Sequence, residues 1–180
     1  IANWRVDFFD GTASKTTAKL ANLHLHSSSA SCLTGMKRGL LIGDGVNEAR
    51  RVAATPPNIC NPTWMAKEAK KIAKKSGLRA KVVSFSQAKA LGLGGIVNVG
   101  KGSEHKPCLI ILEHRPKKSS KEHLCLVGKT ITYDTGGYSL KVNNGMKGMK
   151  YDKNGGMAVL GAMKAISSLD VPVRVTALLP

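Results

Sequence analysis

The sequence predicts an α/β fold in which a mixed, mostly parallel sheet is flanked by helices. Two observations support this class. Segments whose apolar residues recur at helical spacing alternate with short apolar runs that have the length of strands. Several of those runs are continuously apolar, which is typical of strands that helices cover on both faces. With 180 residues the chain is long enough for one domain with a hydrophobic core.

Three long helices are expected, and proline, glycine and capping residues mark their ends. The first covers about 40–54 and ends at Thr-Pro-Pro-Asn, because proline cannot continue a helix. The second begins at Asn61, whose side chain can cap a helix with proline at its first position, and ends at the following Ser-Gly pair. The third covers 154–168. A shorter helix is expected after Ser86, which can cap it.

Strands are expected where short apolar runs lie between turn residues. They cover 80–86, 96–100, 108–114, 123–128, 130–134 and 173–179, and the segment 1–11 reads as a further strand and turn. The run at 173–179 has no partner after it in the sequence, so it is expected to be an internal strand of a longer fold.

The first part of the chain differs in composition from the rest. Residues 1–34 are rich in serine, threonine and alanine, and we interpret them as a linker or the remnant of an N-terminal domain. The chain starts with Ile1, which indicates a processed or trimmed end. His24 and His26 are interpreted as surface residues, since a metal site needs further ligands.

The cysteines favour a reducing compartment. None of the four forms a C-x-x-C pair, and Cys60, Cys108 and Cys125 lie next to apolar residues. They are expected to be reduced thiols in the core. The predicted location is cytoplasmic, with an organelle as the alternative.

The charge is strongly positive, with 28 Lys and Arg against 11 Asp and Glu and a net charge of +17. Such a surface is either simply solvated or binds nucleic acid or an acidic protein surface. Apolar runs are too short to span a bilayer, so no membrane partner is expected. Aromatic residues make up only 4% of the chain, so phosphate contacts would dominate over base stacking. The candidate nucleic-acid contacts are Lys70, Lys71, Lys74, Lys75, Lys117 and Lys118.

The segment VGKTITYDTGGYSLKVNNGMKGMKYDKNGG, residues 127–156, holds the candidate site. Asp134 and Asp152 each lie within three residues of a glycine pair, with lysines nearby. Two carboxylates suit a divalent cation. A lysine that ligates a metal must lose its proton, whereas a second, protonated lysine could stabilise an oxyanion. The alternative is a glycine-rich turn with solvated lysines.

This segment resembles the leucine aminopeptidase family of cytosolic metallo-exopeptidases. Its residue types and spacings agree with the family pattern without a gap. The upstream segments GVNEARRVAATPPNICNPTW and LGLGGIVNVGKGSEHKPCLIILEH look like the corresponding family segments. The resemblance covers about Gly35 to Pro180. It implies that residues 35–180 form a partial aminopeptidase catalytic domain, incomplete at its C-terminus.

The resemblance implies a role for each matching residue. Lys129 and Asp152 match ligands of one metal ion, and Asp134 matches the aspartate that bridges two metals. Lys141 matches the catalytic lysine that contacts the scissile carbonyl, and Met149 matches a residue lining the substrate pocket. The family's complete enzymes use two divalent ions, manganese or zinc, to activate the attacking water, and they assemble as hexamers.

Departures from the family pattern leave two functions open. The family's later N-T-D-A-E-G-R element, which supplies further ligands, does not occur before Pro180, so one metal ion or none is expected for this chain alone. Lys153 stands where the family usually has methionine, and Met157 replaces a small residue. The first function is a metal-dependent aminopeptidase that releases leucine-like N-terminal residues from peptides. The alternative is an inactive, basic remnant that acts as a structural or nucleic-acid-binding component of a ribonucleoprotein assembly.

Overall fold

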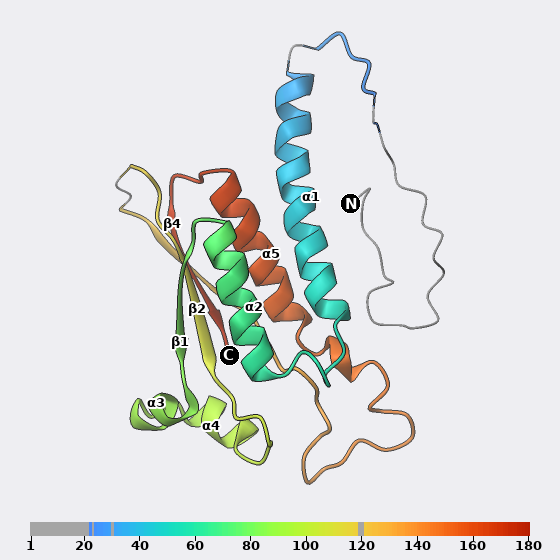
Figure 1. Ribbon diagram of the computed structural model, residues 1–180, viewed down its shortest axis with the longest axis vertical. Helices are drawn as coiled ribbons and strands as arrows, with labels where there is room; N and C mark the ends of the chain where they lie inside the picture. Colours follow the sequence, from blue (N-terminus) through green and yellow to red (C-terminus); the bar gives the residue numbers. More distant parts are fainter. Residues whose placement is uncertain (1–21, 23, 30, 119–120) are drawn as a thin grey trace.

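The structure is a computed structural model, and it describes residues 22, 24–29, 31–118 and 121–180. The strand expected at 1–11 lies outside the described residues. The elements in chain order are α1 Cys32–Ala54, α2 Pro62–Lys75, β1 Arg79–Val83, α3 Phe85–Ala90, α4 Gly94–Gly100, β2 Leu109–His114, β3 His123–Val127, the short 3-10 helix η1 Met149–Tyr151, α5 Asn154–Ser168 and β4 Arg174–Leu179 (Figure 1). Both kinds of element are present in alternation, which confirms the α/β class.

The four strands form one mixed sheet in the order β1-β2-β4-β3. Strand β4 pairs parallel to β3, because α5 carries the chain back across the sheet between them. The β1–β2 and β2–β4 pairings are antiparallel. The prediction of a mixed sheet is therefore confirmed, but the prediction that it is mostly parallel is wrong for these strands. The short helices α3 and α4 lie at one end of the sheet, so the chain reverses there instead of crossing over (Figure 1).

The expectation that 173–179 is an internal strand is confirmed, since β4 lies between β2 and β3. Alternate residues of β2 and β4 are buried, and they pack against α2 and α5 in the core. Helix α1 packs along α5 (Figure 1). The two helices cross closely at a glycine pair: a Cβ on Gly45 would lie 2.5 Å from the carbonyl oxygen of Gly161. Glycine is required there because the backbones touch.

Two helix predictions are confirmed closely because their signals are local. Asn61 Oδ1 accepts a hydrogen bond from the Trp64 amide at 2.9 Å, and Pro62 is the first residue of α2. The third predicted helix has the bounds of α5. Helix α1 begins earlier than expected, at Cys32.

Two predicted strands are wrong. Residues 96–100 belong to α4, none of whose residues is buried, since this segment lies outside the sheet. Residues 130–134 belong to none of the described strands and include a bend at Thr132. The Thr130 amide donates to the carbonyl of Pro180, directly after β4.

Two smaller predictions are also corrected. The cap of α3 is Ser84, not Ser86: Ser84 Oγ accepts from the Gln87 amide, and Gln87 Oε1 accepts from the Ser84 amide. Cys125 is exposed rather than in the core, because it lies on the edge strand β3. Of the other two predicted core thiols, Cys60 is buried and Cys108 is half-buried. All four cysteines are free. None of the described helices combines the length and the apolar character that crossing a bilayer requires.

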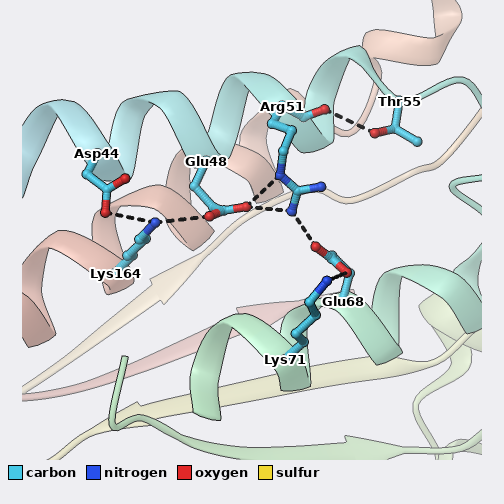
Figure 2. Close-up of polar contacts among 7 residues, drawn as sticks. All are labelled: Asp44, Glu48, Arg51, Thr55, Glu68, Lys71 and Lys164. Carbon is cyan, nitrogen blue, oxygen red and sulfur yellow. Dashed lines mark hydrogen bonds and ion pairs between the residues drawn. The ribbon is translucent and has the colours of Figure 1, made fainter. Parts of the chain in front are cut away.

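Five charged side chains join the three long helices, and we call them the helix network: Asp44, Glu48, Arg51, Glu68 and Lys164 (Figure 2). Lys164 on α5 contacts Asp44 at 2.9 Å and Glu48 at 3.0 Å on α1. Arg51 of α1 bridges Glu48 to Glu68 of α2. Burial alone would raise the pKa of Glu48, but hydrogen bonds from Lys164 and Arg51 lower it below its ordinary value.

Candidate metal and catalytic site

The predicted site begins where β3 ends against the start of α5. The Gly156 amide donates to the Lys129 carbonyl at 2.6 Å. A Cβ on Gly128 would lie 2.7 Å from the Gly155 carbonyl oxygen, and one on Gly156 would collide with Thr130. The glycines of the motif therefore let the strand end and the helix start touch. This contact brings Lys129 next to Asp152, which lies just before the start of α5.

The first ion pair of the site joins Lys129 and Asp152. Lys129 Nζ lies 2.7 Å from Asp152 Oδ1. The Asp152 side chain is 19% exposed and Lys129 is 57% exposed. The second carboxylate oxygen, Asp152 Oδ2, is buried and has no hydrogen-bond partner among the described residues. A buried carboxylate oxygen without a donor is uncommon and is suited to accept a cation.

The second ion pair joins Lys141 and Asp134, with Nζ 3.3 Å from Oδ2. The Gly136 amide donates to Asp134 Oδ1 at 2.8 Å, a turn for which Gly136 adopts a φ of +88°. This backbone hydrogen bond is the main cause that lowers the pKa of Asp134, followed by Lys141 and by the charge of Lys129. The structure therefore shows the four predicted polar residues as two ion pairs, Lys129–Asp152 and Lys141–Asp134, and the charge of Lys129 also acts on Asp134.

Met149 lies one turn before Asp152. It begins η1, and its carbonyl accepts a hydrogen bond from the Asp152 amide at 3.2 Å. Its side chain is half-buried. The loop around Lys141 exposes apolar residues, with Tyr138 and Val142 largely open to solvent. The contact between Met149 and Asp152 is thus one between their backbones.

Lys153 has an environment that the sequence pattern did not reveal. Its side chain is fully buried, and Nζ donates to the carbonyl oxygens of Thr55, at 3.1 Å, and Lys150. Burial lowers the pKa of this lysine, and the charge of Lys150 lowers it further. It ties the end of α1 to the turn that carries Asp152. The one sequence signal was that a lysine stands where the resemblance implies methionine.

The donor set fits part of a divalent metal site. Asp134 and Asp152 offer carboxylate oxygens, and Lys129 would ligate only after losing its proton. The described residues contain no group of three or more His, Cys, Asp and Glu side chains that could hold a metal ion. In the structure the lysines neutralise both carboxylates instead. The arrangement can bind a cation at the expense of an ion pair, and Lys141 supplies a further ammonium beside Asp134.

The lysines of the alternative function do not gather in the same way. Lys70, Lys71, Lys74 and Lys75 are exposed on α2, while Lys117 and Lys118 are exposed after β2. Lys71 lies 3.8 Å from Glu68 and Lys117 lies 3.0 Å from Asp170, so part of this charge is paired.

The chain is similar to known aminopeptidases. The profile of the cytosol aminopeptidase family, catalytic domain, matches residues 47–180. A probable cytosol aminopeptidase of Methylobacillus flagellatus is 36% identical over 99% of this chain and 37% of its own length. One from Nitrosococcus oceani is 42% identical over 81% of this chain and 29% of its own length. The chain thus spans about a third of the length of these curated relatives.

Solved structures show the same likeness. The bottromycin maturation enzyme BotP in complex with Mn superposes with a TM-score of 0.79 and 31% identity, over 84% of this chain and 33% of that one. The apo leucyl aminopeptidase from Trypanosoma cruzi superposes with a TM-score of 0.76 and 32% identity, over 79% of this chain and 28% of that one. On the profile match, the sequence identity and the shared fold, the chain belongs to the cytosol aminopeptidase family.

Proposed function

We propose that the protein is a metal-dependent aminopeptidase that releases leucine-like residues from the N-terminus of peptides. Family membership supports the reaction class. The observation that carries the proposal is the Lys129–Asp152 pair with its unpartnered buried Asp152 oxygen, together with the Asp134–Lys141 pair, in which the charge of Lys129 also lowers the pKa of Asp134. A merely structural pair would have no reason to leave a buried carboxylate oxygen unsatisfied.

Each residue has a distinct role in this proposal. Asp134, Asp152 and a deprotonated Lys129 would hold the metal. When bound, manganese or zinc supplies an activated water and polarises a carbonyl. Lys141 stays protonated and donates to the oxygen of the scissile carbonyl, where negative charge develops. Met149 contacts the first side chain of the substrate.

The complete site needs more ligands than the described residues provide, since two metal ions cannot be enclosed by two carboxylates and one lysine. The described residues hold no further cluster of acidic, histidine or cysteine side chains. We therefore propose the activity for the complete protein, with additional ligands from outside these residues. The same resemblance supports a cytoplasmic homo-oligomer, a hexamer, and light scattering tests that assembly.

The test measures release of the amide fluorophore from a leucine aminocoumarin substrate, with and without manganese or zinc. Activity is expected only with metal, and Asp152→Asn should lower it at least about a hundredfold through lost metal affinity. Lys141→Met should lower kcat by about a hundredfold or more, because the oxyanion loses its ammonium. Lys147→Met, in the same loop and with the same change of charge, is the control and should keep full activity. Metal-independent release, or an active Asp152→Asn variant, would refute the proposal.

A separate binding measurement keeps the metal claim testable without turnover. Titration of manganese into the 180-residue chain, followed by electron paramagnetic resonance, should show saturable binding that Asp152→Asn removes. If the 180-residue chain binds no manganese but the complete protein does, metal binding requires the additional ligands from outside these residues. If neither binds, the metal role of these residues is wrong.

The alternative, a basic component of a ribonucleoprotein, is supported by the charge of the chain. Most described carboxylates are engaged in ion pairs within the fold, so the surplus of lysine faces solvent. This function requires steeply salt-dependent binding of RNA. Filter binding at two salt concentrations separates it from the peptidase proposal, because unchanged affinity would exclude phosphate contacts as its basis.

A further inference from the structure

A surface groove of about 280 Å³ lies between the start of α2, the end of β1 and the segment that precedes β2. None of its lining residues belongs to the 127–156 segment. Its apolar surface includes Ala66, Val82 and Phe85. Three lysines also line the groove, Lys67, Lys70 and Lys106, and all three side chains are exposed. The groove therefore combines an apolar floor with a cationic rim.

The fold holds part of this rim in place. Lys106 Nζ donates to the carbonyl oxygens of Lys101, at 2.9 Å, and Ser103, at 2.8 Å, and keeps a third donor for a ligand. Lys67 and Lys70 are three residues apart on α2 and so share one face of the helix. Burial raises the pKa of the Cys108 thiol in the groove, and the charge of Lys70 opposes this rise. The Lys70 ammonium thus acts on the groove itself.

These cations have no acidic partner in the part of the chain that the structure describes. The acid on the same helix, Glu68, is engaged by Arg51 and Lys71 on another face. Lys67, Lys70 and Lys106 form no ion pair with any described carboxylate. Three ammonium groups around an apolar surface, with no counter-charge, favour a ligand that brings both carboxylates and an apolar group.

We propose that this groove binds an acidic peptide segment of a partner protein, with one aliphatic side chain on the apolar floor and its carboxylates at Lys67, Lys70 and Lys106. The volume is at the lower end of the roughly 300–1,000 Å³ typical of small-molecule sites. It accommodates a side chain rather than a large cofactor. The partner recognised by this chemistry is an acidic, partly apolar segment.

RNA fits the groove less well. Phe85 is the aromatic residue of the lining, and Lys89 Nζ already lies over its ring, 4.6 Å from the centroid. A base would have to displace that lysine in order to stack. The lining also contains no arginine, the residue that binds phosphate in a bidentate way.

The test uses a fluorescent, glutamate-rich peptide with one central leucine, and measures its anisotropy as the 180-residue chain is added at low salt. Lys67→Gln/Lys70→Gln should weaken binding about fivefold to tenfold, the effect of losing two exposed charge contacts. The matched control is Lys74→Gln/Lys75→Gln, which makes the same change of charge at exposed positions of the same helix. It should stay within about twofold of the wild type. Replacing the peptide's leucine by serine should weaken binding about fivefold, because the apolar floor loses its partner.

Each other outcome overturns the proposal. Equal weakening by both double variants would mean that only the overall charge attracts the peptide. Equal binding of the leucine and serine peptides would remove the role of the apolar floor. An unstructured uridine RNA that binds more tightly than the peptide, and is released by Lys67→Gln/Lys70→Gln alone, would assign the groove to nucleic acid. Unchanged melting temperatures of both variants exclude unfolding as the cause, and peptidase activity is independent of all these results.

Discussion

The helix network and the candidate site are built from the same residue types, but they differ in how completely their charges are paired. In the helix network, Glu48 contacts both Arg51 and Lys164, and Glu68 contacts both Arg51 and Lys71 (Figure 2). In the candidate site each carboxylate has one ion-pair partner, and Asp152 keeps a buried oxygen without a donor.

Exposure follows this division only in part, since Asp44 of the helix network is 63% exposed and Asp152 of the candidate site only 19%. The side chains of Glu48, Glu68 and Lys164 are 18%, 11% and 17% exposed, whereas Lys129 is 57% exposed. A paired network among packed helices fixes their positions and has no capacity left for a ligand. A half-paired cluster at the end of a strand contributes little to stability and retains the capacity to bind a cation. The comparison predicts large stability effects in the first region and small ones in the second.

The largest effect is expected for Arg51→Met. This change leaves Glu48 with one cation and Glu68 with only the distant Lys71. Mostly buried carboxylates that each lose a close cation should lower the free energy of unfolding by about 2–3 kcal/mol, less than for a fully buried pair because Arg51 is 31% exposed. Urea denaturation measures it. Lys71→Met, at a 61% exposed position, is the control and should cost less than about 0.5 kcal/mol.

The second prediction concerns stabilisation of the fold by metal binding at the candidate site. Manganese at about one hundred times its dissociation constant should raise the free energy of unfolding by about 2.7 kcal/mol. Asp152→Asn should abolish this gain, whereas Arg51→Met should keep it, since the helix network holds no metal. Calorimetric melting with added manganese checks both variants. A gain that disappears with Arg51→Met and survives Asp152→Asn would reverse the assignment of the two regions.

A third prediction concerns pH. The pKa of Glu48 lies below its ordinary value of 4.5 in the folded state. Pairing of Glu48 therefore stabilises the fold fully above pH 4.5, and this contribution is lost as the pH falls through the folded pKa. The difference in unfolding free energy between wild type and Glu48→Gln should be about 1 kcal/mol at about pH 7 and should shrink at about pH 3. A constant difference would mean that hydrogen-bond geometry, not charge, holds the helix network together.

Local signals predicted much of the fold. Asn61 followed by proline marked the start of α2, and the small residues near Asn154 marked α5, because capping and turn chemistry depend on adjacent residues. Strand pairing depends on distant residues instead. The segment 130–134 has strand composition, but it pairs with none of the described strands. The direction of β2 was likewise fixed by how the chain turns at α3 and α4.

The candidate site shows the same limit. The spacing of Lys129, Asp134, Lys141 and Asp152 led to their grouping, through the resemblance to a family. The burial of Lys153 could not be predicted, since its partner Thr55 is far away in the sequence. The helix network also joins residues of three helices, as with Glu48 and Lys164. Ionic contacts between distant elements have no local sequence signal.

Lys153 sharpens the comparison because its buried amine contacts backbone carbonyls and forms no ion pair with a carboxylate of the described residues. Its folded pKa lies below the ordinary 10.5, so its burial costs stability at neutral pH, and this cost fades as the pH rises from the folded pKa to above 10.5. The unfolding free energy of wild type relative to Lys153→Met should therefore increase between neutral and alkaline pH, by less than the Arg51→Met effect. Urea denaturation at the two pH values measures it. A difference that falls with pH would show that Lys153 stabilises the fold as a cation.

The smallest effect is expected for Lys129→Met without metal. The Lys129–Asp152 contact is short, but more than half of the lysine side chain is exposed, so water screens the pair. The free energy of unfolding should change by less than about 1 kcal/mol. The same variant should weaken manganese binding clearly, because it removes a proposed ligand while leaving both carboxylates in place. A loss of stability as large as that of Arg51→Met, with manganese affinity unchanged, would make this lysine a structural residue and would remove the distinction between the two regions.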